Sequence, residues 1–144
     1  MTSEEIHSKT IAIADRYGDR NPQQTRQMLT ALSKSDPKAV FEGLYKAFLS
    51  SEGDYFTRQK LAGKLLYESK PRLPIDLKEV IYGCLDTYNL SVDELPRYLC
   101  ELCGMEEMLT TIRELRNAKL SERQAESLAV FHWWLAGPAQ GTNG

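Results

Sequence analysis

Residues 36–43 read DPKAVFEG, and residues 76–83 read DLKEVIYG. Both stretches begin with Asp, a favoured N-cap residue, and both continue with apolar residues at helical spacing. Each also carries a glycine inside the expected helix, which costs about 1 kcal/mol relative to alanine. We therefore expect two similar amphipathic helices, each with a neighbouring element packed closely against its glycine.

Further helix-start signals recur along the whole chain. Thr2 and Ser121 are each followed three residues later by Glu or Gln, as in a capping box. The expected helices begin near Thr2, Asn21, Asp36, Asp54, Asp76, Ser91, Met105 and Ser121. Apolar alternation with a period of two, which would indicate strands, does not occur. The predicted fold class is all-α, with about eight short antiparallel helices.

Prolines and glycines mark the expected breaks. Pro71 and Pro74 bias the residues before them towards extended geometry, so residues 70–74 are predicted to be a linker. Pro96 lies inside the sixth expected helix and predicts either a kink or a later helix start. The composition after Leu135 predicts a flexible tail at 137–144, which leaves 1–136 as a single helical domain.

The 40-residue offset between the two similar stretches resembles the period of HEAT and armadillo repeats. This resemblance covers most of the chain and depends on period and patterning alone. It implies stacked helix hairpins, with units at about 1–33, 36–70, 76–104 and 105–135. The last unit lacks the shared pattern, and an irregular helical bundle is the alternative arrangement.

Charge and composition narrow the expected partners. The chain has 18 basic and 20 acidic residues, and residues 91–144 carry 5 basic and 8 acidic ones. Because no basic cluster is evident, nucleic acid is not an expected partner. The odd number of cysteines, the acidic N-terminus and the lack of a long apolar run predict a cytoplasmic protein without a membrane span.

Cys100 and Cys103 form a CxxC motif, and Cys84 is a possible third ligand for zinc. A structural zinc site normally has four ligands, and a redox CxxC normally follows a strand, so packing in the core is the preferred interpretation. His132 has no traceable nucleophile or orienting group. We therefore predict no metal, no cofactor and no catalytic residue, and we expect the chain not to be an enzyme.

Several aromatic residues lie off the apolar stripes and indicate a contact surface. Tyr, Trp and Arg dominate the energetics of protein interfaces. The predicted partner-binding residues are Tyr82, Arg97, Tyr98, Glu101 and Trp133. The expected function is a non-enzymatic protein–protein interaction module, of which an inhibitor or immunity protein is one form.

Two other functions stay open at this point. A helical enzyme would need a site between helices made by carboxylates and a histidine such as His132. A helical repeat protein that processes nucleic acid would need a basic concave face. Its candidate residues are Arg58, Lys60, Lys64, Arg72 and Arg97.

Overall fold

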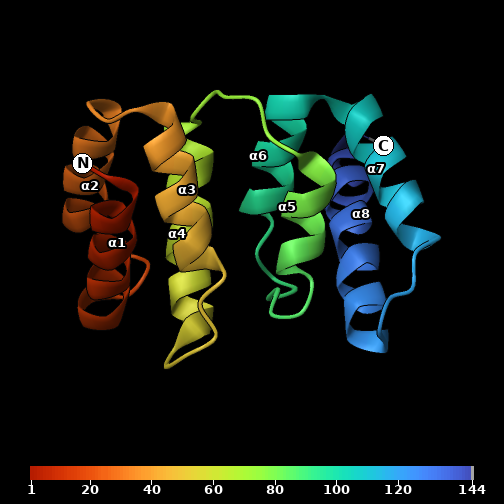
Figure 1. The fold of residues 1–144 in the computed structure, drawn as a ribbon, viewed down its shortest axis with the longest axis horizontal. Helices are drawn as coiled ribbons and strands as arrows, with labels where there is room; N and C mark the ends of the chain where they lie inside the picture. Colours follow the sequence, from red (N-terminus) through yellow and green to blue (C-terminus); the bar gives the residue numbers. More distant parts are fainter. Residues whose placement is uncertain (144) are drawn as a thin grey trace. The chain divides into compact units, whose positions relative to one another are not determined.

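The computed structural model describes residues 1–143, and it describes the side chains of residues 1–135. Within that range the backbone forms eight helices and no strand, which confirms the all-α prediction (Figure 1). The chain divides into two compact units, Met1–Leu73 and Pro74–Gly144, and the boundary falls inside the predicted linker. The predicted single domain, 1–136, stays a prediction, as does the tail at 137–144, whose side chains lie outside the described part.

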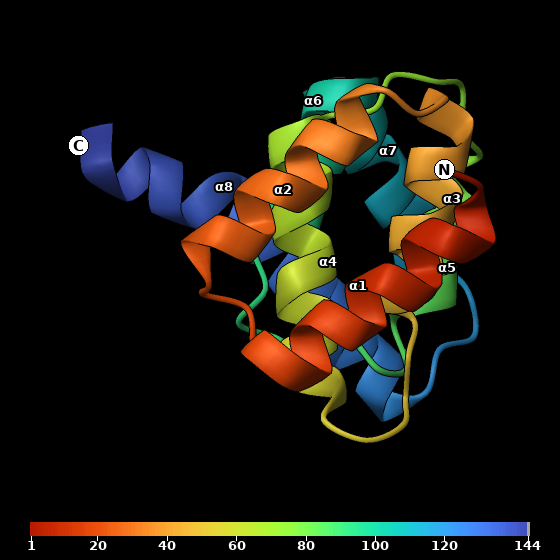
Figure 2. The same ribbon diagram turned by 90° about the vertical axis from the view of Figure 1, so that its left-hand side faces the viewer.

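The first unit has two layers of helices, which are made by α1 (Ser3–Tyr17), α2 (Pro22–Ser33), α3 (Pro37–Phe48) and α4 (Tyr55–Ser69). α1 packs against α3 and α4, α3 packs against α4, and α2 packs against α4. Figure 2 shows α1 and α2 as the nearer layer over α3 and α4. The centre of the unit is filled by Ile6, Met28, Leu44, Phe48, Leu61, Leu65 and Leu66, each at most 1% exposed.

The start of α1 forms the predicted capping box. The Glu5 amide donates to Thr2 Oγ1 at 3.1 Å, and the Thr2 amide donates to Glu5 Oε1 at 2.9 Å. Asn21 and Asp54 likewise accept from the amides three residues on. These bonds satisfy amides that the first helical turn leaves without an intrahelical partner, so they fix the helix starts.

Gly43 lies in α3 where this helix crosses α1. A Cβ atom at Gly43 would lie 2.6 Å from the Ser3 carbonyl oxygen and 2.7 Å from Ile6 Cβ. The predicted close neighbour is therefore confirmed at this glycine. The matching prediction at Gly83 is wrong, because Gly83 lies on the exposed side of its helix.

The second unit consists of α5 (Leu77–Cys84), α6 (Glu94–Cys103), α7 (Met105–Arg116) and α8 (Glu122–Asn143). α5 packs against α7, α6 packs against both α7 and α8, and α7 packs against α8. Its core includes Ile81, Cys84, Leu85, Tyr88, Leu95, Leu99, Met108 and Phe131, all fully buried. None of the helices in the described residues is both long and apolar enough to cross a bilayer.

Pro96 decides where α6 begins. α6 starts at Glu94 and not near Ser91, which puts Pro96 in the first turn and is the later start that Pro96 predicted as one of two outcomes. Proline is tolerated there because its missing N–H has no intrahelical partner in any case. α5 ends at Cys84. Tyr88, beyond the end of α5, is buried, and its hydroxyl donates to the Val92 carbonyl at 2.6 Å.

The irregular segment between α5 and α6 is held by side chains of α8. Ser127 Oγ donates to the Leu85 carbonyl at 2.8 Å, and Trp134 Nε1 donates to the Leu90 carbonyl at 3.0 Å. Arg123 donates to the carbonyls of Asp86 and Tyr88. Because unpaired carbonyls are costly when they are shielded from water, these bonds fix both the segment and the rotation of α8 about its axis.

Candidate partner-binding surface

The rotation of α8 determines which of its residues face solvent. Ser127, Phe131 and Trp134 point into the unit, and Phe131 packs edge-on against Tyr88 with 4.8 Å between ring centroids. Since successive helical residues are separated by about 100°, Trp133 then points away from the core. Its side chain is 56% exposed.

The exposed Trp133 ring is held in place by its neighbour. The rings of Trp133 and Trp134 pack edge-on with centroids 4.7 Å apart, and Trp134 is itself fixed by its bond to the Leu90 carbonyl. An aromatic side chain that is already ordered loses little conformational entropy when it is buried by a partner. Trp133 therefore has the properties of an interface anchor.

Tyr82 is the predicted site residue that lines a hollow among the described residues of the second unit. Its side chain is 46% exposed. The hollow has a volume of about 440 Å³ and lies between α5 and the end of α7. It is lined by Asp76, Lys78, Glu79, Tyr82, Leu115, Ala118 and Lys119. Four of these residues are charged, and the other three supply apolar or aromatic surface, a mixture that suits a contact with another protein.

The remaining predicted residues lie on α6. Arg97 is exposed and forms an ion pair with Asp93 at 2.9 Å, and Glu101 is exposed one turn further along. Tyr98 is only 1% exposed and belongs to the core, because it lies on the side of α6 that carries Leu95 and Leu99. The assignment of Tyr98 to an accessible surface is therefore corrected.

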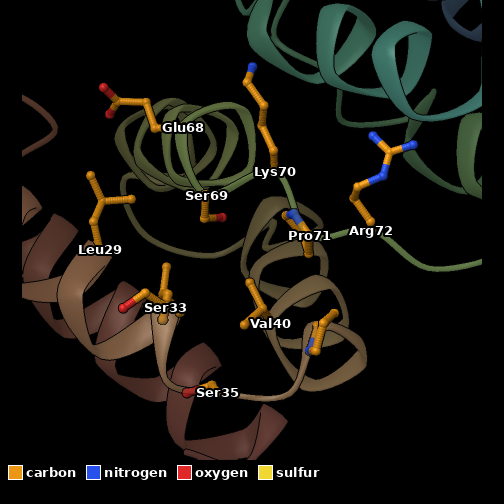
Figure 3. Close-up of a pocket in the computed structure, with 11 residues that line it drawn as sticks. Leu29, Ser33, Ser35, Val40, Glu68, Ser69, Lys70, Pro71 and Arg72 are labelled. Atoms are coloured by element: carbon orange, nitrogen blue, oxygen red, sulfur yellow. The ribbon is translucent and has the colours of Figure 1, made fainter.

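The sequence did not predict a second hollow, which lies in the first unit at the ends of α2 and α4 and the start of α3. Its volume is about 440 Å³. Figure 3 shows Leu29, Ser33, Val40, Ser69 and Pro71 around it, while the charged ends of Lys70 and Glu68 point away. The serine hydroxyls donate to backbone carbonyls of their own helices. The hollow is therefore mostly apolar. The sequence contains one indication of this hollow, the linker at 70–74, because Pro71 of the linker is buried against the helices.

His132, the histidine considered for catalysis, contacts an arginine. Arg116 Nη2 donates to His132 Nδ1 at 3.3 Å, so this imidazole faces a cation and not the carboxylate of a base–orienter pair. Within the described residues, no group of three or more His, Cys, Asp or Glu side chains is placed to hold a metal ion.

The cysteines have two different environments. Cys84 is fully buried, and burial raises the pKa of its thiol to about 12. Core packing is thus confirmed for Cys84. Cys100 and Cys103 are only half-buried, so core packing does not describe them fully. Partial burial and the neighbouring carboxylates of Glu101 and Glu107 raise the pKa of these two thiols, which disfavours a reactive thiolate at neutral pH.

Comparison of the chain with known protein families, with curated proteins and with solved structures finds no match.

Proposed function

We propose that this chain is a non-enzymatic protein-binding module that docks on its partner through the exposed face of α8 around Trp133. The observation that carries the proposal is a tryptophan that is 56% exposed while its ring is held against a second, anchored tryptophan. A large apolar side chain gains about 1.5–3 kcal/mol on going from full exposure to full burial, and Trp133 has 56% of its surface left to bury. Few other residue types contribute as much to an interface.

The rest of this face defines the chemistry of the partner. Glu122, Glu126, Ala129 and Trp133 are spaced so that they share one side of α8, and all four are exposed. Arg123 Nη1 lies 3.7 Å from Glu126 Oε1, so these two residues form an ion pair. Glu122 is then a carboxylate without an ion pair among the described residues. The second unit carries 6 of the 18 basic residues and 11 of the 20 acidic ones. A partner with basic groups around an apolar pocket complements this face.

An inhibitor or immunity protein is one form of such a module. A small acidic protein can block a basic active site by covering it, and neither catalysis nor a cofactor is needed for this. Electrostatic attraction between the acidic unit and a basic target also accelerates association. In this form of the proposal, Trp133 is the anchor and the carboxylates set the orientation.

The HEAT-like arrangement belongs to the same proposal. In both units the first helix packs against the third and the second against the fourth, as happens when helix pairs stack. The exposed Gly83 and the short α5 of 8 residues support the alternative of an irregular bundle. We favour stacked pairs because the same order of packing recurs in both units.

The two alternative functions have less support. The first unit is basic, with 12 basic and 9 acidic residues, but its Arg58 is engaged by Asp15 at 2.7 Å and by Ser50 at 2.9 Å. Arg97 is likewise paired with Asp93. An enzyme site made by His132 and two carboxylates has little support, since His132 contacts Arg116.

Capture of the partner from cells that make this protein tests the proposal. The immobilised chain is expected to retain one protein in stoichiometric amount, and Trp133→Ala is expected to reduce its recovery by at least about tenfold. Tyr17→Ala is the matched control, because Tyr17 is also an exposed aromatic (41%) but lies in the first unit. Equal recovery by the wild type and by Trp133→Ala would contradict the proposal.

A further inference from the structure

Three sulfur-containing residues lie where α6 turns into α7. Cys100 and Cys103 lie in the last turn of α6, and Met105 is the first residue of α7. Gly104 between the helices has a φ of 95°, which an L side chain rarely adopts and which allows an abrupt change of direction. The turn brings Met105 back over α6, so that Cys100 Sγ and Met105 Sδ are 4.0 Å apart.

The second thiol belongs to the same cluster. Cys103 follows Cys100 by three residues, and this spacing puts two side chains on one face of a helix with about 5–6 Å between their Cβ atoms. Cys103 therefore lies on the same face of α6 as Cys100, whose sulfur contacts Met105.

Solvent reaches this cluster. Both thiols are half-buried, and Met105 is 44% exposed, in contrast to Cys84, which is fully buried. Core packing explains Cys84 but not a methionine at the surface beside two accessible thiols. The cluster is thus open to a ligand from solution.

The chemistry of the three side chains selects the ligand. Thiolate and thioether sulfurs are soft donors, and soft donor sets select Cu(I) over harder cations. Two sulfurs bound to one ion at about 2.3 Å, with an angle near 120° between the bonds, are roughly 4 Å apart. The separation of 4.0 Å between Cys100 Sγ and Met105 Sδ matches this spacing. Zn²⁺ fits this donor set less well, because structural zinc sites normally have four ligands and thioether sulfur is not among the usual ones.

We propose that Cys100, Cys103 and Met105 form a binding site for one Cu(I) ion at the junction of α6 and α7. Each thiol releases its proton to solvent as its sulfur–copper bond forms, and the thioether binds without loss of a proton. No change of oxidation state takes place. The site is separate from the exposed face of α8 and does not depend on the proposed protein partner.

The test is a titration of the reduced chain with Cu(I) under nitrogen, in competition with the coloured chelator bathocuproine disulfonate. We expect the wild type to withdraw one equivalent of copper, and we expect X-ray absorption to show three sulfur ligands. Cys100→Ser and Cys103→Ser are expected to weaken binding by at least about 100-fold, and Met105→Leu by about tenfold. Circular dichroism checks that each variant is folded.

Two comparisons decide the outcome. Met105→Leu keeps the size of an exposed side chain and removes only the thioether, so it leaves the fold intact. Copper affinity that is unchanged in this variant would overturn the three-sulfur site. Cys84→Ala removes the remaining thiol, and its copper affinity is expected to equal that of the wild type. Loss of binding in Cys84→Ala, or tighter binding of Zn²⁺ than of Cu(I) by the wild type, would also overturn the proposal.

Discussion

The Cβ atom that Gly43 lacks would lie 2.7 Å from the Cβ atom of Ile6. Real Cβ atoms do not approach so closely, so the crossing of α1 and α3 depends on this glycine. The helix that repeats the sequence pattern, α5, has its glycine on the surface. The same local sequence therefore serves two different packing arrangements.

Gly43→Ala is expected to destabilise the first unit. The added methyl group overlaps the Ser3 carbonyl and the Ile6 side chain, and separating the two helices costs about 1–3 kcal/mol. Gly83→Ala is the matched control, because it makes the same change on an exposed helical position and is expected to raise stability by up to about 1 kcal/mol. Urea unfolding of both variants measures the difference. Equal effects in the two variants would show that the crossing does not need Gly43.

The pair formed by Arg58 and Asp15 links α4 to α1. Arg58 donates to both carboxylate oxygens of Asp15, and its guanidinium lowers the pKa of that carboxyl. Because the Asp15 side chain is 44% exposed, Asp15→Asn is expected to cost no more than about 1 kcal/mol, and less at high salt. Urea unfolding at low and at high salt checks this. Glu42→Gln, on an exposed position of α3, serves as the control. A cost that did not change with salt would contradict an ionic contribution.

The hydrogen bond from Ser127 to the Leu85 carbonyl is expected to stabilise the second unit. It is buried and 2.8 Å long, and Ser127→Ala removes its donor. The expected loss is about 1 kcal/mol. Ser8→Ala, on an exposed position of α1, is expected to change stability by less than about 0.5 kcal/mol. Thermal unfolding measures both variants, and a neutral Ser127→Ala would mean that the bond does not hold α8.

His7 is expected to make stability depend on pH. Burial, and then the charges of Lys46 and Arg58, lower its pKa from 6.5. The unfolded chain therefore binds a proton more readily than the folded chain between the lowered pKa and 6.5. The stability that neutral His7 contributes to the folded chain is therefore fully present above pH 6.5 and is lost as the pH falls towards the lowered pKa. Urea unfolding at several pH values should show a steeper loss of stability below 6.5 in the wild type than in His7→Gln. Parallel curves would contradict this assignment.

Much of the fold could be predicted because its signals are local. Thr2, Asn21, Asp54 and Asp76 each accept a hydrogen bond from the amide three residues on, and the helices start where these side chains occur. Such bonds depend only on neighbouring residues, so sequence spacing reveals them. The start of α6 could not be predicted uniquely, because Pro96 is compatible either with a kinked helix or with a helix that starts later.

The candidate partner-binding surface was harder to predict, because it depends on contacts between segments that are distant in the sequence. The sequence indicates that Tyr98 and Trp133 are both off the main apolar stripes, yet Tyr98 is buried and Trp133 is exposed. What separates them is the rotation of each helix, which for α8 is set by bonds to carbonyls more than 30 residues away. The proposed copper site was not apparent from the sequence for a similar reason. Met105 is adjacent to the CxxC motif in sequence, but only the turn at Gly104 shows that its sulfur returns to Cys100.

The affinity of the captured partner for the wild type and for Trp133→Ala is the most direct test of the protein-binding function. Isothermal calorimetry with the purified partner is expected to show that Trp133→Ala weakens binding by at least about 30-fold, which corresponds to about 2 kcal/mol. Tyr17→Ala is expected to bind as the wild type does. An unchanged dissociation constant for Trp133→Ala would contradict the account, because the exposed and ordered tryptophan of α8 would then have no role in recognition.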